Sequence, residues 1–130
     1  MIVDTSAIVA ILKGEPEARR LTELIAHDAA TKLSAATSVE LFAVADVRGQ
    51  PAQAHRVDEL LSTLGITIVP FDEAQARIAR EAYRDFGKGS GHAAQLNLGD
   101  CFAYALSVQS GEPLLFVGND FAATDVTIAA

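Results

Sequence analysis

The chain has 130 residues, a net charge of −7 and a hydrophobic fraction of 50%. This length and composition suffice to bury a core without disulfides or structural metals, and they predict one domain over residues 1–130. The negative charge argues against a protein that grips nucleic acid by bulk attraction, because phosphate contacts need clustered lysine and arginine.

Cysteine usage and the N-terminal sequence bear on the location of the protein. The single cysteine, Cys101, has no partner for an internal disulfide, and the N-terminus lacks the features of a secretory signal. Charged residues interrupt every apolar stretch before the roughly 18 residues that span a bilayer. We therefore expect a cytoplasmic protein that does not enter a membrane.

The predicted elements alternate between strands and helices along the chain. In order, they are a strand at residues 1–3, helices at 6–13 and from 15–16 onward, a strand at 32–35, helices at 37–48 and 51–64, a strand at 66–69, helices at 73–86 and 100–109, a strand at 114–117 and a short edge strand at 126–128.

Strands separated by helices call for a parallel sheet with right-handed crossovers and helices on both faces. The predicted fold class is therefore α/β, with three layers, α/β/α, around a central parallel sheet of four to five strands. Such sheets bind ligands at the carboxyl ends of the strands, where the strand order reverses beside the first strand.

Asp4 directly follows the first strand, which places it at the ligand-binding edge of the predicted sheet. The structural alternative is that Asp4 caps the helix that follows, although Thr5 or Ser6 can fill the same role. Position alone leaves both roles of Asp4 open.

Glu40 also has a structural alternative, because Thr37-x-x-Glu40 matches a capping box. Against this role, Ala43, Val44 and Val47 follow Glu40 at helical spacing and are all apolar. Glu40 is therefore expected on the face that turns toward the core, where a carboxylate needs a partner or a metal. The sequence leaves the capping role and a functional role open.

Asp100 begins a predicted helix that contains no other charge, so this helix should be largely buried. The helix dipole favours an acid in the first turn, but burial makes an unpartnered charge costly by several kcal/mol, which favours a functional role. Cys101 points about 100° away around the helix and is expected to be an inert buried thiol.

Asp120 follows the last long strand within the turn Gly118-Asn119-Asp120. Asparagine and aspartate favour turns, so a turn-forming role would be sufficient explanation. Asp125 lies close by in the sequence and competes with Asp120 for the same functional role.

Together, four acids occupy positions that can lie on one edge of the sheet: Asp4, Glu40, Asp100 and Asp120. Four converging carboxylates raise one another's pKa values, so such a cluster implies a cation. The oxygen ligands and the absence of a His-x-x-x-His or Cys-x-x-Cys pair point to Mg²⁺, with Mn²⁺ as a substitute. Metal-assisted phosphodiester hydrolysis is the corresponding reaction class, because the usual second partner of Mg²⁺ is a substrate phosphate.

A basic stripe of Arg77, Arg80 and Arg84 continues toward Lys88 and His92 in a glycine-rich loop. These residues can steer a phosphate backbone, but acids interleave with the arginines and favour an ordinary solvated face with ion pairs. The loop follows a helix and fails the phosphate-loop pattern, so we expect a lid or a linker.

The segments that carry the acids resemble the PIN domain family, specifically the VapC-type toxins of bacterial toxin–antitoxin pairs. The resemblance covers essentially the whole chain and rests on Val3-Asp4-Thr5-Ser6-Ala7, Glu40, the stretch from Tyr83 to His92, Asn97-x-Gly-Asp-Cys-Phe-Ala-Tyr-Ala and Gly118-Asn119-Asp120-Phe121. It implies a Mg²⁺-dependent endoribonuclease that hydrolyses RNA with a metal-activated water. It also implies a homodimer and a small VapB-type antitoxin whose C-terminal segment lies over the acidic pocket.

The same resemblance implies roles for individual residues. By position, Asp4, Glu40 and Asp100 match the first three acids of the family, and Thr5 or Ser6 would contact water on the metal. The resemblance fixes the fourth acid less firmly, because the local turn varies. Our choice for the fourth acid is Asp120, with Asn119 as a helper and Asp125 in reserve.

Two other classes of protein compete with this interpretation. The first is another Mg²⁺-dependent α/β phosphohydrolase or a receiver-like domain, but a receiver needs an acid after its third strand and a lysine after a later one. Here Pro70 follows the third strand, and Gly118 follows the late strand without a lysine. The second is a catalytically silent binding module, against which the presence of all four acids argues.

Overall fold

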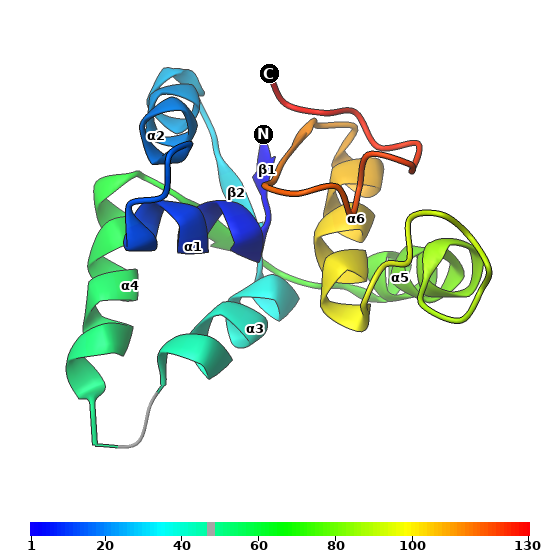
Figure 1. Ribbon diagram of the computed structural model, residues 1–130, viewed down its shortest axis with the longest axis horizontal. Coiled ribbons are helices and arrows are strands. Elements are labelled where there is room, and N and C mark those ends of the chain that lie inside the picture. Colours follow the sequence, from blue (N-terminus) through cyan, green and yellow to red (C-terminus); the bar gives the residue numbers. More distant parts are fainter. Residues whose placement is uncertain (47–48) are drawn as a thin grey trace.

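The computed structural model describes residues 1–46 and 49–130 (Figure 1). Four parallel strands form one sheet in the order β3-β2-β1-β4. The strands are β1 (Ile2–Val3), β2 (Lys32–Ser34), β3 (Thr67–Val69) and β4 (Leu114–Leu115). The predicted parallel sheet is therefore confirmed with four strands. The expected edge strand at residues 126–128 is reduced to a single bridge between Leu114 and Ile128.

The helices of the described residues follow the predicted order. They are α1 (Thr5–Lys13), α2 (Ala18–His27), α3 (Ala35–Ala45), α4 (Pro51–Thr63), α5 (Glu73–Phe86) and α6 (Leu98–Ser110). None of these helices has the length and apolar character needed to cross a bilayer. α2 begins later than predicted because Pro16 and Glu17 form a turn, and the predicted end of the third helix, Arg48, lies outside the described residues.

Helices cover both faces of the sheet, as the sequence predicts. Helices α1 to α4 lie on one side, with a core that includes Leu21, Leu33 and Leu41 (Figure 1). Helices α5 and α6 lie on the other side, where Leu114 and Phe121 belong to a second core. Burial on both faces explains why β1 and β4 read as continuous apolar runs, whereas β2 contains Lys32 and Ser34 and β3 is largely exposed.

The strand order reverses at β1. The chain passes from β1 to β2 to β3 in one direction, and β4 then returns to the other side of β1. The crevice expected in such a sheet therefore lies at the carboxyl ends of β1 and β4. Asp4 follows β1 at this point, as predicted from the sequence.

Helix α6 is largely buried, which confirms the prediction from its lack of charge. Its buried residues include Asp100, Cys101 and Tyr104. Burial raises the pKa of Cys101 to about 12, with a further contribution from the charge of Asp100. Cys101 is thus a buried thiol of low reactivity, because the thiolate is the reactive form.

Candidate functional site

The two oxygens of the Asp4 carboxylate have different environments. Oδ2 accepts hydrogen bonds from Ser6 N–H (3.0 Å) and from the Ser6 hydroxyl (2.7 Å), so Asp4 is the N-cap of α1. Oδ1 is buried and has no hydrogen-bond partner within the part of the chain that the structure describes. Capping and a functional role are therefore compatible in Asp4, because each can use its own oxygen.

Ser6 joins the beginning of α1 to the segment after β4. Its hydroxyl donates to Asp4 and accepts a hydrogen bond from Val117 N–H (3.0 Å), 111 residues away in the sequence. This hydroxyl thus forms hydrogen bonds to both sides of the crevice at the reversal of strand order, and it holds the Asp4 carboxylate in place.

Glu40 is bound by a side chain of α1. The Thr5 hydroxyl donates to Glu40 Oε1 (2.7 Å). The capping box with Thr37 is wrong, because α3 begins earlier than predicted and its N-cap is Ser34, whose Oγ accepts from Ala36 N–H (3.2 Å). Thr37 is instead a buried residue inside the helix.

The prediction that Glu40 shares a core-facing column is also wrong. Val44, one turn later, is 63% exposed, and Val47 lies outside the described residues. The Glu40 carboxylate instead approaches the first turn of α6, where a Cβ added to Gly99 would overlap Oε2. Glu40 is therefore half-buried between α1 and α6. The apolar residues that follow it at helical spacing on α3 did not predict this location.

Asp100 lies in a reciprocal capping box at the start of α6. Its Oδ2 accepts from Asn97 N–H (3.0 Å), and Asn97 Oδ1 accepts from Asp100 N–H (2.9 Å). Burial raises the pKa of Asp100 to about 7 against the opposing effect of the Asn97 hydrogen bond. The charges of Asp4, Asp120 and Glu40, in this order, raise this pKa further.

The four predicted acids share one region: the Glu40 carboxylate contacts Thr5 and lies against Gly99, and the charges of Asp4, Glu40 and Asp120 all raise the pKa of Asp100. Burial also raises the pKa of Asp4, against the hydrogen bonds from Ser6, and the charge of Glu40 adds to the increase. Within residues 1–46 and 49–130, however, no three His, Cys, Asp or Glu side chains form a ready ligand set for one ion. The carboxylates are close enough to interact but remain apart, as mutual repulsion favours.

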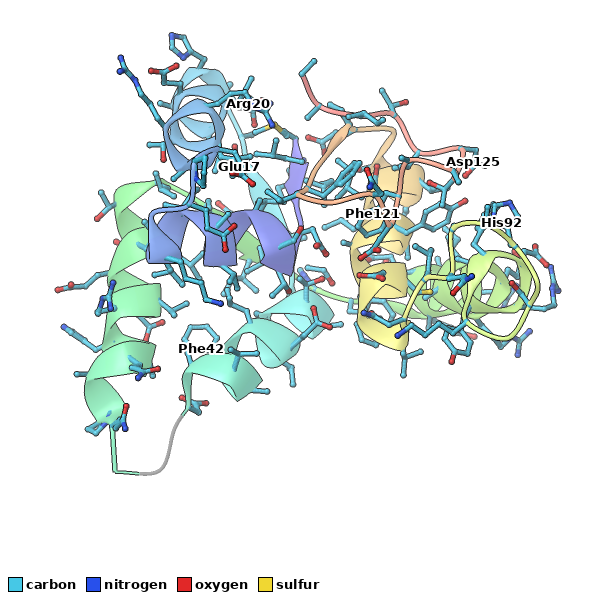
Figure 2. The ribbon with its side chains drawn as sticks, in the orientation of Figure 1. Glu17, Arg20, Phe42, His92, Phe121 and Asp125 are labelled. Atoms are coloured by element: carbon cyan, nitrogen blue, oxygen red, sulfur yellow. The ribbon has the colours of Figure 1, made fainter. Side chains whose placement is uncertain are left out.

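The two candidates for the fourth acid differ in their surroundings. Asp120 is exposed in the turn after β4, and its charge raises the pKa of Asp100. Asp125 accepts a hydrogen bond from the Tyr104 hydroxyl (2.6 Å), and Figure 2 shows it on the far side of α6 from α1. The geometry favours Asp120 for the acid cluster and gives Asp125 a structural contact.

The residues of this cluster fit a hard divalent cation. All donors are oxygens, and a buried oxygen of Asp4 has no partner among the described residues. Burial and mutual repulsion make the ionised forms of Asp4 and Asp100 unfavourable, which a cation would relieve. Oxygen donors of this kind suit Mg²⁺ or Mn²⁺ better than zinc.

Sequence reasoning missed the role of Gly99. The available signal was a glycine directly before the predicted helix, because glycine in a helix turn is unfavourable without a packing reason. The contact between Ser6 and Val117 left no such local signal.

Comparison with known proteins agrees with this architecture. The family model described as the PIN domain matches residues 1–126, so the chain belongs to the PIN domain family. Ribonuclease VapC42 of Mycobacterium tuberculosis is 51% identical over 126 residues, which cover 97% of this chain and 96% of that protein. Ribonuclease VapC28 of the same species is 48% identical and covers 97% of this chain and 95% of its own length.

Solved structures share the fold. VapBC2 from Rickettsia felis, bound to a DNA fragment from its promoter, superposes with a TM-score of 0.75 at 18% identity and covers 98% of this chain and 94% of that chain. FitAcB from Neisseria gonorrhoeae gives a TM-score of 0.72 at 24% identity and covers 99% and 96%. These likenesses confirm the predicted PIN-like α/β/α fold.

Proposed function

We propose that this protein is a Mg²⁺-dependent endoribonuclease that acts in the cytoplasm as the toxin of a toxin–antitoxin pair. Its membership of the PIN domain family and its 51% identity to a protein named a ribonuclease support this function. The observation that carries the proposal is the meeting of the acids at the reversal point of the sheet, where Glu40 accepts a hydrogen bond from Thr5, next to Asp4, and lies against Gly99, next to Asp100. Such a cluster needs a cation and suits a phosphodiester substrate.

Asp4, Glu40, Asp100 and Asp120 would hold the metal, with Mn²⁺ as a substitute for Mg²⁺. A bound Mg²⁺ supplies positive charge that polarises the phosphodiester and lowers the pKa of an attacking water. The overall charge of −7 is then no obstacle to RNA binding, because the positive charge is supplied locally.

The chain itself orients the acids. Ser6 holds Oδ2 of Asp4 through two hydrogen bonds, and Thr5 holds Oε1 of Glu40 through one. Asn97 N–H holds Oδ2 of Asp100. In each carboxylate one oxygen is fixed by the protein, so the other is presented in a set orientation and little reorganisation is needed during the reaction.

Cleavage of RNA by the purified protein tests this function. Asp4→Asn and Asp100→Asn should each reduce cleavage by at least about 100-fold, because transition-state charge stabilisation of several kcal/mol is lost. Asp58→Asn, an exposed acid on α4, is the matched control and should cleave like the wild type. A chelator should abolish cleavage, and Mg²⁺ or Mn²⁺ should restore it. Equal cleavage by the Asp4 and Asp100 variants would mean that the site is misplaced.

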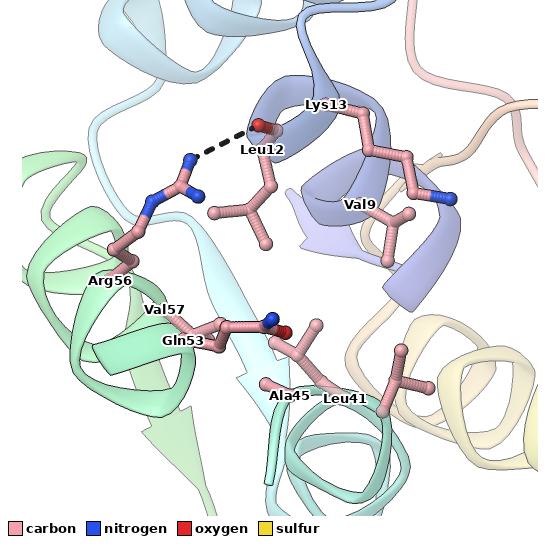
Figure 3. Close-up of a pocket in the computed structure, with 9 residues that line it drawn as sticks. Val9, Leu12, Lys13, Leu41, Ala45, Gln53, Arg56 and Val57 are labelled. Atoms are coloured by element: carbon pink, nitrogen blue, oxygen red, sulfur yellow. Dashed lines mark hydrogen bonds between the residues drawn. The ribbon is translucent and has the colours of Figure 1, made fainter. Parts of the chain in front are cut away.

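The antitoxin is the partner that this function requires. An apolar hollow between α1, α3 and α4 is lined by Val9, Leu12, Leu41, Val44 and Val57, among others (Figure 3). The hollow lies along α1 and α3, and the first turns of these helices lie beside the acids. A single antitoxin segment that fills the hollow can therefore continue over the acid cluster. We assign this hollow to the apolar part of the antitoxin and the acid cluster to a basic tail, as charge complementarity favours.

Two cations border the same hollow. Arg56 Nη2 donates to the Leu12 carbonyl (3.5 Å), and Lys13 stands on the last turn of α1 (Figure 3). Acidic side chains of the antitoxin at the rim would pair with them. The family resemblance also supports a homodimer, which light scattering of the purified protein would detect.

A further inference from the structure

Two cations on α5 and in the loop after it have no carboxylate partner within the described residues. Arg77 lies 3.6 Å from a glutamate one turn earlier, and Arg84 lies 2.8 Å from the adjacent aspartate. In the same part of the chain, neither Arg80 nor Lys88 has an Asp or Glu oxygen within 4.0 Å. Among the arginines and the lysine of the basic stripe, Arg77 and Arg84 therefore have a carboxylate partner, whereas Arg80 and Lys88 are available to a ligand.

Arg80 borders the first turn of α6. It lines a shallow, mostly apolar hollow together with Tyr83 on α5 and with Leu98 and Phe102 on α6. Leu98 is the first residue of α6 and is 58% exposed, and Asp100 follows two residues later. Arg80 therefore lies beside the helix turn that carries Asp100.

Lys88 approaches the same turn through the loop between α5 and α6. Its backbone N–H donates to the Leu96 carbonyl (2.9 Å). The other end of the Leu96–Asn97 peptide, the Asn97 N–H, donates to Asp100 Oδ2 (3.0 Å). With standard bond lengths, the backbone nitrogen of Lys88 lies no more than about 8.5 Å from Asp100 Oδ2. The loop expected to be a lid or a linker is thus hydrogen-bonded at its base, and it carries an exposed lysine to the edge of the acid cluster.

Tyr83 connects the two cations. It follows Arg80 by three residues, so the two share one face of α5, and it precedes by four residues Gly87, which caps the end of this helix. A Cβ on Gly87 would lie 2.9 Å from Tyr83 Cδ2, which places the ring against the backbone that leads into Lys88. Tyr83 is 39% exposed. We call Arg80 and Tyr83 on α5, together with Lys88 just after the end of this helix, the α5 ridge.

We propose that the α5 ridge binds the RNA strand next to the scissile phosphate, with Arg80 and Lys88 on phosphates and Tyr83 stacked on a base. The proposal rests on the ribonuclease function and adds to it a subsite for single-stranded RNA. Cations that follow the backbone and aromatic rings that stack on bases are the usual means of binding unpaired strands. In a chain of net charge −7, two cations free of carboxylates beside the acids are the natural contacts for a polyanion.

Binding of a short, fluorescently labelled single-stranded RNA tests the ridge. The measurement uses Asp100→Asn as a background that does not cleave, in Mg²⁺ and at several salt concentrations. Arg80→Ala and Lys88→Ala should each weaken binding about fivefold and reduce the slope of log K against log salt by about 0.7, the effect of one phosphate contact. Arg77→Ala and Arg84→Ala are the matched controls on the same helix and should change neither quantity.

The aromatic contact has its own variants. Tyr83→Leu should weaken RNA binding at all salt concentrations without changing the slope, and Tyr83→Phe should retain binding because it keeps the ring. In the active protein, the ridge variants should raise KM and leave kcat within about twofold, because they act on binding rather than on the reacting groups.

The outcomes separate this proposal from the ribonuclease function. If the wild type cleaves RNA and the Arg80, Lys88 and Tyr83 variants all bind and cleave like it, the ridge is not a subsite. If the wild type neither binds nor cleaves any RNA, the ribonuclease function itself is wrong. If the Arg80 and Tyr83 variants change the molecular mass in light scattering while RNA affinity per chain stays the same, a second copy of the chain covers the ridge and the proposal fails.

Discussion

The carboxylate of Glu40 on α3 occupies the space that a side chain on Gly99 of α6 would need. Alanine in place of glycine inside a helix usually stabilises a protein by about 1 kcal/mol. Here we expect Gly99→Ala to destabilise the protein and to reduce RNA cleavage at least about tenfold, because the Glu40 carboxylate must move. Urea denaturation and cleavage assays measure both effects.

A double variant tests whether Glu40 causes this result. Glu40→Ala removes the overlapping carboxylate, so Gly99→Ala in that background should recover the normal stabilising effect of alanine. Additive effects of the two substitutions on the free energy of unfolding would contradict the packing relationship.

Substitution of the two candidate fourth acids should separate their roles. Asp120→Asn should strongly reduce cleavage and leave the melting temperature nearly unchanged, because Asp120 is exposed and acts on Asp100 through its charge. Asp125→Ala should lower stability by about 1 kcal/mol through loss of the Tyr104 hydrogen bond, with cleavage largely retained. Loss of cleavage only in the Asp125 variant would reverse the assignment.

The raised pKa of Asp100 predicts how stability depends on pH. In the absence of divalent cations, the folded protein keeps a proton on Asp100 up to about pH 7, whereas the unfolded chain releases it near the ordinary value of 3.8. The free energy of unfolding should therefore decrease as pH rises from about 4 to 7, with no further decrease from this group above pH 7.

Asp100→Asn should remove this part of the pH dependence. The variant should match the wild type near pH 4 and exceed its stability by up to a few kcal/mol at pH 7.5 in a chelator. Urea denaturation across this range, with Asp58→Asn as the control, measures the effect. The same pH slope in wild type and Asp100→Asn would show that Asp100 ionises freely in the folded protein.

Ser6→Ala should destabilise the protein by about 1–3 kcal/mol. The substitution removes a hydroxyl that donates to Asp4 Oδ2 and accepts from Val117 N–H, and it leaves a donor without its partner at the crevice. Ser38→Ala is a suitable control, because that hydroxyl donates only to a carbonyl within its own helix (2.6 Å). Similar losses in the two variants, measured by chemical denaturation, would argue against a special role for Ser6.

Val44→Asp should weaken binding of the cognate VapB-type antitoxin at least about tenfold and leave RNA cleavage intact. Val44 is 63% exposed at the hollow of Figure 3, so a carboxylate there disturbs docking more than folding. Val39→Asp, 70% exposed on the same helix but outside that hollow, is the matched control. Calorimetric titration with the antitoxin distinguishes the two, and equal affinities would exclude the hollow as the docking site.

Much of the fold can be predicted from the sequence, because the patterns that indicate its strands and helices are local. Apolar runs predict β1, β3 and β4, residues 32–35 predict β2 more weakly, and the uncharged stretch that begins at Asp100 predicts a buried helix. The alternation of these elements then allows few topologies. The position of Asp4 beside the reversal of strand order follows from the same reasoning.

The details of the candidate site depended on contacts between distant segments. Thr37-x-x-Glu40 matched a local capping pattern, but Ser34 begins the helix three residues earlier and leaves Glu40 free to contact α1 and α6. The choice between Asp120 and Asp125 depends on how the turn after β4 folds, which neighbouring residues do not determine. No local pattern specifies such long-range contacts.

The divided role of the Asp4 carboxylate bears on how the protein can lose its activity. One oxygen anchors the first helix turn, and the other faces the acid cluster without a partner among the described residues. Asparagine can keep the anchoring oxygen while removing the charge, whereas alanine removes both. Inactivating changes at this position therefore disturb the fold least when they preserve the shape of the side chain. The Asp4→Asn variant, rather than Asp4→Ala, is the suitable inactive form for producing a toxic nuclease in cells.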